Sequence, residues 1–203
     1  MFRNEPGHIL LRFWHYPVVT LGPGRRLGLW LQGCSIHCKG CIAPENQPFD
    51  TSFSRSLDEL MRNWEPVLNG EAGVTVSGGE PLDQADSLLE LLERLNGCGV
   101  KDILIYSGYL KERALSLCPD LQNRIAALVD GPFVEGAATP SPWKGSENQT
   151  LTIFREEYRE AYESWSVNAE RRMQLIKNET GRYLIGIPRQ EDRWREQVLG
   201  MRK

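Results

Sequence analysis

Short apolar stretches of strand length alternate with longer amphipathic stretches over residues 1–130. The apolar stretches predict strands at residues 27–32, 74–77, 102–106 and 126–130. The amphipathic stretches predict helices at residues 56–68, from Asp83 to just before Gly97, and at 110–125 with a break near Cys118 and Pro119. Such alternation indicates a parallel sheet that is covered by helices and joined by right-handed crossovers.

The segments around these elements carry signals of their own. Ser56 and Glu59 have the spacing of a capping box at the start of the first helix. One face of the second helix carries four leucines, Leu88, Leu91, Leu92 and Leu95. Residues 9–21 are apolar and β-branched. The turn after them is interpreted as solvated, with Arg25 and Arg26 in water and not against an acidic partner.

The last fifty or so residues follow another pattern. Residues 156–165 are charged, with three aromatic residues at helical spacing. Two apolar stretches, residues 173–177 and 182–187, flank a turn sequence, which predicts a hairpin. We therefore predict a core of residues 1–155 and a C-terminal extension of residues 156–203, a helix plus a hairpin packed on the core.

Composition narrows the class of protein only a little. The chain has 203 residues and a formal net charge of −3, which does not indicate a nucleic-acid or anionic-membrane partner. No apolar run approaches the ~18 residues needed to span a bilayer, and the first residues lack the apolar stretch of a signal peptide. The five cysteines are an odd count and do not indicate a disulfide framework. We therefore expect a cytoplasmic protein in a reducing compartment, without nucleic-acid or membrane partners.

Three cysteines follow the first core strand at C-x-x-x-C-x-x-C spacing: Cys34, Cys38 and Cys41. The same spacing would place three buried thiols on one face of a helix. Gly33, Gly40 and Pro44 indicate a loop instead, and a loop can bring three thiolates to one inorganic centre. Three ligands would leave one iron of a four-iron cluster open to an outside ligand. Zinc is the main alternative metal.

The strand expected at 74–77 runs into a second motif, Gly78-Gly79-Glu80-Pro81. Glycines at a strand end let the backbone approach a ligand closely, although a simple turn explains them equally well. The other core strands also end in polar or glycine residues. Four such positions lie at the carboxyl ends of the strands: Cys34, Gly78, Ser107 and Asp130. Ligands of α/β barrels collect at these ends.

Together the two motifs resemble those of the radical S-adenosylmethionine (SAM) superfamily, which carries the same cysteine triad and a Gly-Gly-Glu-Pro strand end. The sequence Cys38-Lys-Gly-Cys41 is similar to the Cys-Pro-Gly-Cys of anaerobic ribonucleotide reductase activating enzymes, whereas many other members have an aromatic residue where Gly40 stands. Residues 128–133 (LVDGPF) and 143–149 (WKGSENQ) resemble later segments of the same enzymes. The resemblance covers about residues 20–150.

The resemblance implies a fold and a set of ligands. The fold is an incomplete α/β barrel of the radical SAM type, open along one side where a macromolecular substrate enters. The cofactors are a 4Fe-4S cluster, held by Cys34, Cys38 and Cys41, and SAM. Gly78 and Gly79 would offer backbone groups to the methionine part of SAM.

Three further residues are candidates for contacts with SAM. Glu80 is expected to accept a hydrogen bond or to support the turn, and Ser107 to contact the ribose or the methionine. Asp130 matches a polar strand-end position in the family, with a surface carboxylate as the alternative. Residues 143–149 are expected either to gate the open side or to form a plain loop. A valine at Gly79 is expected to weaken SAM binding and to leave the cluster in place.

The implied reaction is reductive cleavage of SAM, in which one electron from the reduced cluster breaks a carbon–sulfur bond and gives methionine and a 5′-deoxyadenosyl radical. The implied partners are a glycyl radical enzyme, such as an anaerobic ribonucleotide reductase, and a flavodoxin- or ferredoxin-like reductant.

Some features depart from the family pattern. Residues 42–46 lack the usual aromatic-asparagine opening, and Lys144 stands where an arginine is usual. Two other functions therefore stay open: a radical SAM enzyme acting on a small molecule or a peptide, and a non-catalytic iron–sulfur or metal-binding module. His37, Cys98 and Cys118 are not expected to be ligands.

Overall fold

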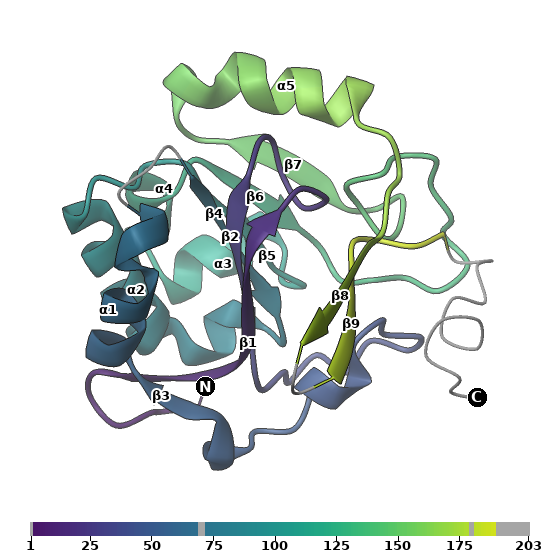
Figure 1. Cartoon of the computed structure of the whole chain (residues 1–203). Helices are drawn as coiled ribbons and strands as arrows, with labels where there is room; N and C mark the ends of the chain where they lie inside the picture. The colour runs from purple at the N-terminus through teal and green to yellow at the C-terminus, as the bar shows by residue number, and fades with distance from the viewer. Residues whose placement is uncertain (1, 69–71, 179–180, 190–203) are drawn as a thin grey trace.

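The computed structural model describes residues 2–68, 72–178 and 181–189 (Figure 1). Its main sheet has the strand order β3-β1-β2-β4-β5-β6-β7. The strands are β1 (His8–Val18), β2 (Arg26–Leu31), β3 (Ser54–Ser56), β4 (Gly73–Gly78), β5 (Ile103–Tyr106), β6 (Ala127–Asp130) and β7 (Thr150–Ile153). The central strands β2, β4, β5 and β6 pair in parallel, and β1, β3 and β7 pair antiparallel. In the described part of the chain β3 and β7 do not pair, so the sheet is not a closed barrel.

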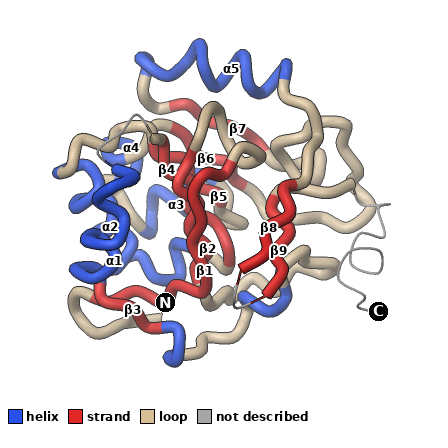
Figure 2. The backbone as a smooth tube through the Cα atoms, in the orientation of Figure 1, coloured by secondary structure: helices blue, strands red, loops and turns tan. Residues whose placement is uncertain are grey.

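Four helices cover one face of this sheet (Figures 1 and 2). They are α1 (Leu57–Leu68), α2 (Ala85–Gly97), α3 (Lys111–Leu117) and α4 (Leu121–Arg124). The predicted leucine face of α2 is buried in the main core against Leu29, Val76 and Ile105 of the sheet. The parallel strands and their helices are thus confirmed, including the break near Cys118. None of the described helices is long and apolar enough to cross a membrane.

The structure corrects the prediction at several points. Residues Pro81–Gln84 form a 3-10 helix, η3, so Asp83 lies within it and α2 begins only at Ala85. Gly97 is the last residue of α2 and not the residue after it. Strands β3 and β7 were not predicted, because β3 (Ser-Arg-Ser) has no apolar residue and β7 (Thr-Leu-Thr-Ile) lacks the continuous apolar run of β5 and β6.

The other face of the sheet is covered by the C-terminal extension. After β7 the chain forms η4 (Glu156–Tyr158) and α5 (Arg159–Asn168), followed by a separate hairpin of β8 (Gln174–Asn178) and β9 (Gly181–Ile185). The predicted helix and hairpin are therefore both present. Residues 190–203 of the predicted extension lie outside the described residues.

The extension spans the side of the sheet that was expected to be open. The ring of Tyr183 in β9 stacks on Phe13 of β1, with centroids 4.2 Å apart. Gln174 donates a hydrogen bond to the carbonyl of Pro17, also in β1 (2.8 Å). On the other side, the guanidinium of Arg171 donates to the carbonyl of Thr139, in the segment that leads to β7 (3.2 Å). Residues 171–178 and 181–185 thus connect β1 with that segment, and this side of the sheet is not bare.

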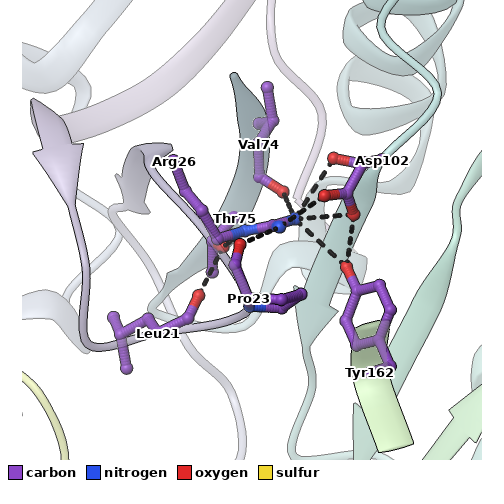
Figure 3. A network of polar contacts seen from close by, with 7 residues as sticks. All are labelled: Leu21, Pro23, Arg26, Val74, Thr75, Asp102 and Tyr162. Carbon is purple, nitrogen blue, oxygen red and sulfur yellow. Dashed lines mark hydrogen bonds and ion pairs between the residues drawn. The ribbon is translucent and has the colours of Figure 1, made fainter. Parts of the chain in front are cut away.

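Arg26 lies in the interior and not in a solvated turn, which corrects the interpretation made from the sequence (Figure 3). Its side chain is 0% exposed, and its guanidinium forms an ion pair with Asp102 (2.7 Å). It also donates to the hydroxyls of Thr75 (2.6 Å) and Tyr162 (3.1 Å), and Tyr162 donates to Asp102 (2.6 Å). A charge at full burial is stable only when paired and hydrogen-bonded in this way. The network joins α5 to the amino ends of β2, β4 and β5.

Replacing Asp102 with alanine should therefore lower the free energy of unfolding by about 3 kcal/mol, because it leaves the guanidinium of Arg26 buried without its anion. This value is the lower end of the range usual for breaking a buried ion pair, because the Asp102 side chain is 23% exposed. Urea unfolding of the cluster-free protein measures this. Asp58→Ala, which removes the exposed partner of Arg94, is the control and should cost no more than about 1 kcal/mol. Equal decreases in the free energy of unfolding of the two variants would contradict a stabilising role of the buried Arg26–Asp102 ion pair.

Candidate functional site

The loop with the three cysteines begins directly after β2, and the glycine pair lies at the end of β4. These strands are neighbours, with Leu31 opposite Gly78. Two backbone hydrogen bonds join the motifs: Gly79 N–H donates to the carbonyl of Leu31 (2.8 Å), and Glu80 N–H donates to that of Gly33 (2.8 Å). The two sequence motifs therefore form a single site at the carboxyl ends of β2 and β4.

The cysteine segment is a loop, as its glycines and proline predict. Residues 32–43 contain no helix, and Gly33 and Gly40 have φ angles of +101° and +74°, in the left-handed region that favours glycine. The three thiols are free and partly buried. Burial raises the pKa of Cys34 and of Cys38.

The three thiols are the donors of the predicted metal site. Among the described residues, no three His, Cys, Asp or Glu side chains form a group that could hold one metal ion. Cysteine thiolates are the ligands that iron–sulfur clusters take. That Cys34, Cys38 and Cys41 hold a four-iron cluster, with zinc as the alternative, stays a prediction.

Asp83 and Tyr109 hold the cysteine loop in place, a role that the sequence did not reveal. Asp83 is 4% exposed. Its carboxylate accepts hydrogen bonds from the backbone N–H (2.6 Å) and the hydroxyl (2.9 Å) of Ser35, the residue after Cys34. The hydroxyl of Tyr109, which follows β5, donates to the same carboxylate (2.8 Å). The only signal in the sequence was an acidic residue near a helix start, which usually indicates a cap.

Gly78 and Gly79 are required by the packing of the strand ends. A Cβ atom on Gly79 would lie 2.0 Å from the carbonyl oxygen of Gly33, and one on Gly78 would lie 2.3 Å from the backbone nitrogen of Leu31. The N–H of Gly79 is already bonded to Leu31, so the group that Gly79 can offer a ligand is its carbonyl oxygen. A side chain at Gly79 would displace the cysteine loop, which argues against the expectation that the cluster would survive a valine there.

Glu80 supports the turn, the second of its two expected roles. Its carboxylate is buried and accepts three hydrogen bonds, from Leu82 N–H (3.0 Å), the Ser107 hydroxyl (2.8 Å) and Gly108 N–H (2.7 Å). Burial raises the pKa of Glu80 to about 7, opposed in part by these donors. Ser107 is 4% exposed and holds Glu80. A direct contact of either residue with SAM remains a prediction.

Asp130 is 5% exposed, so the alternative of a surface carboxylate is wrong. Its carboxylate accepts hydrogen bonds from the N–H of Lys111 at the start of α3 (3.0 Å) and from the hydroxyl of Thr150 in β7 (2.6 Å). These bonds join β6 to its neighbours. The predicted contact with SAM is not tested by this geometry.

The other two cysteines lie away from the site. Cys98 follows α2 and Cys118 follows α3. Both helices run back from the carboxyl ends of the strands, so their last residues lie at the opposite end of the sheet. His37 is exposed in the cysteine loop, and its ring nitrogen lies 3.3 Å from the side-chain oxygen of Gln47.

Comparison with known proteins supports an iron–sulfur site in this chain. A family model described as "4Fe-4S single cluster domain" matches residues 20–152. The anaerobic ribonucleoside-triphosphate reductase-activating protein of Escherichia coli (strain K12) is 31% identical over 152 residues, which are 70% of this chain and 97% of the relative. The chain belongs to the radical SAM activating-enzyme family. It is a radical SAM enzyme whose cofactors are a 4Fe-4S cluster and SAM.

Other members of the family match in the same way. The activating protein of the same name from Vibrio cholerae is 30% identical over 148 residues, 69% of this chain and 96% of the relative. The pyruvate formate-lyase-activating enzyme of Listeria monocytogenes is 39% identical over 83 residues, 39% of this chain and 34% of the relative. The family match includes every candidate site residue and ends before η4, so α5 and the hairpin lie outside it.

Proposed function

We propose that this radical SAM enzyme cleaves SAM reductively to methionine and a 5′-deoxyadenosyl radical, and that the radical abstracts a hydrogen atom from the Cα of one glycine in a partner such as an anaerobic ribonucleotide reductase. The observation that carries the proposal is the joining of three free thiols and the Gly78–Gly79 strand end into one site. The names of the similar activating proteins support a glycyl radical enzyme as the partner.

Within this proposal, the open sheet is a partial α/β barrel of the radical SAM type, residues 1–155 form its core, and residues 156–203 are an extension. Cys34, Cys38 and Cys41 hold the cluster. When bound, the cluster supplies one electron to the sulfonium of SAM, and a carbon–sulfur bond breaks. The electron comes from a flavodoxin- or ferredoxin-like protein. The compartment that we propose for the enzyme is the cytoplasm.

The protein's own groups bind and orient the reactants. The carbonyl oxygens of Gly78 and Gly79 are suited to accept hydrogen bonds from the methionine ammonium. Asp83 fixes the cysteine loop through Ser35. Because residues 171–178 and 181–185 span one side of the sheet, we propose that the partner's glycine reaches the site from the carboxyl ends of the strands. The bound partner would then exclude water from the radical.

The reconstituted protein should split SAM when dithionite or a reduced flavodoxin is supplied under anaerobic conditions. Methionine and 5′-deoxyadenosine should form in equal amounts and be absent when the cluster is omitted. With a purified anaerobic ribonucleotide reductase added, electron paramagnetic resonance should show the doublet of a glycyl Cα hydrogen. Deuterium placed on the reductase glycines should appear in 5′-deoxyadenosine.

The outcomes separate the alternatives. Cleavage of SAM without a partner radical would favour an enzyme that acts on a small molecule or a peptide. No cleavage by a fully loaded and reduced cluster would favour a non-catalytic iron–sulfur module and overturn the proposed reaction.

A further inference from the structure

The two later segments that resemble the family, residues 128–133 and 143–149, form one unit in the structure. Two hydrogen bonds join the segments directly: the side chain of Gln149 donates to the carbonyl of Gly131 (2.9 Å), and that of Asn148 donates to the carbonyl of Pro132 (2.8 Å). A third bond comes from Val134, the residue after the first segment, whose N–H donates to the hydroxyl of Ser146 (3.1 Å). Ser146 is fully buried, and the Lys144 ammonium donates to the carbonyl of Glu147 (2.9 Å). The 143–149 segment has no helix or strand, and its hydrogen bonds support residues 131–134.

This unit places the ring of Phe133 between two glycines. A Cβ atom on Gly40, in the cysteine loop, would lie 3.3 Å from Cε1 of Phe133. A Cβ atom on Gly145 would lie 3.2 Å from Cδ2, on the opposite edge of the same ring. The ring thus packs against the cysteine loop on one edge and against its supporting segment on the other. A side chain larger than hydrogen at Gly40 would push Phe133 away.

Two further contacts join the same unit to the cysteine loop. The backbone of Phe133 lies near the thiol of Cys38. The ammonium of Lys39 forms an ion pair with the carboxylate of Glu135 (2.8 Å). The ion pair is exposed and contributes little stability by itself, but together with the ring contact it brings residues 132–135 against the segment from Cys38 to Gly40.

We propose that the side chain of Phe133, held in place by its neighbours in the chain, covers the cluster. The ring keeps water from the cluster beside Cys38. Exclusion of solvent is one of the means by which a protein sets the potential of an iron–sulfur cluster. The inference deepens the proposed function and rests on its cluster assignment.

The first test uses the cluster-free protein. Phe133→Ala should raise the rate at which iodoacetamide alkylates Cys38 several-fold, measured by peptide mass spectrometry relative to Cys98 in the same molecules. Phe133→Leu keeps an apolar side chain of similar size and should stay close to wild type. The control is Val134→Ala, since the side chain of Val134 is 42% exposed, and it should not change the rate.

The second test uses the reconstituted protein. Phe133→Ala should shift the midpoint potential of the cluster to a more positive value, because water stabilises the more highly charged reduced state. It should also shorten the lifetime of the cluster in air. Phe133→Leu should show a smaller effect, and Val134→Ala none.

The outcomes are distinguishable from those of the proposed function. An unchanged alkylation rate and an unchanged potential in Phe133→Ala, with a full cluster, would overturn the cover and leave the proposed reaction intact. Wild-type protein that takes up no iron would overturn the cluster assignment and the cover with it. A faster alkylation of Cys38 together with a more positive potential would establish the role of Phe133.

Discussion

Cys38→Ala is expected to abolish the cluster. After anaerobic reconstitution this variant should hold only a small fraction of the iron and sulfide of the wild-type protein, and Cys34→Ala and Cys41→Ala should behave alike. The three thiols share one loop whose backbone is fixed to the ends of β2 and β4, and loss of one leaves a cluster with two protein ligands. Chemical analysis of iron and sulfide, with the visible absorption of the cluster, measures the effect.

Cys98→Ala is the matched control. Cys98 is exposed, follows α2 and lies at the opposite end of the sheet, so this variant should hold the same iron and sulfide as the wild type. A full cluster in Cys38→Ala would contradict the ligand assignment. Zinc without iron in the protein as isolated anaerobically would contradict it as well and favour the alternative metal.

Gly79→Val is expected to lose the cluster together with the affinity for SAM. A Cβ atom at this position would lie 2.0 Å from the carbonyl oxygen of Gly33 and 3.0 Å from that of Asn46. Both are backbone atoms that flank the cysteine loop and cannot rotate away. The loop must therefore shift, and Glu80 N–H loses its bond to Gly33. We expect the free energy of unfolding to fall by about 1–3 kcal/mol, as in other overpacked sites.

Iron content, urea unfolding and SAM calorimetry on the same preparations test this expectation. Gly97→Val is the control, because a Cβ atom on Gly97 would meet no atom within 4 Å, and it should keep the stability and the iron. A Gly79→Val variant with a full cluster and weakened SAM binding would instead show that Gly79 acts only through contact with SAM.

The sequence was sufficient for the central part of the fold. Strands β2, β4, β5 and β6 are buried on both faces and read as continuous apolar runs, and the helices between them show one apolar stripe each. The edge strand β7 alternates threonine with apolar residues over only four positions, and β3 has three polar residues, so neither shows an apolar run. The antiparallel pairing of the edges depends on contacts between residues far apart in the chain.

Arg26 shows where reasoning from the sequence fails. An arginine beside glycines and a proline is normally solvated. Its burial depends on Asp102 and Tyr162, which come from parts of the chain 76 and 136 residues away. No local pattern reveals such partners, because the ion pair and the hydrogen bonds exist only once β2, β5 and α5 have packed together.

The sequence by itself predicted the ligands and the place of the site. The spacing of Cys34, Cys38 and Cys41 within one loop, and the order of strands and helices, are local properties that the chain carries before it folds. Tertiary structure alone decided that Gly79 packs on the cysteine loop, that Asp83 holds the loop, and that Phe133 packs against it. Each of these depends on backbone or buried polar groups of segments distant in sequence, which find their partners only when the sheet brings the strand ends together.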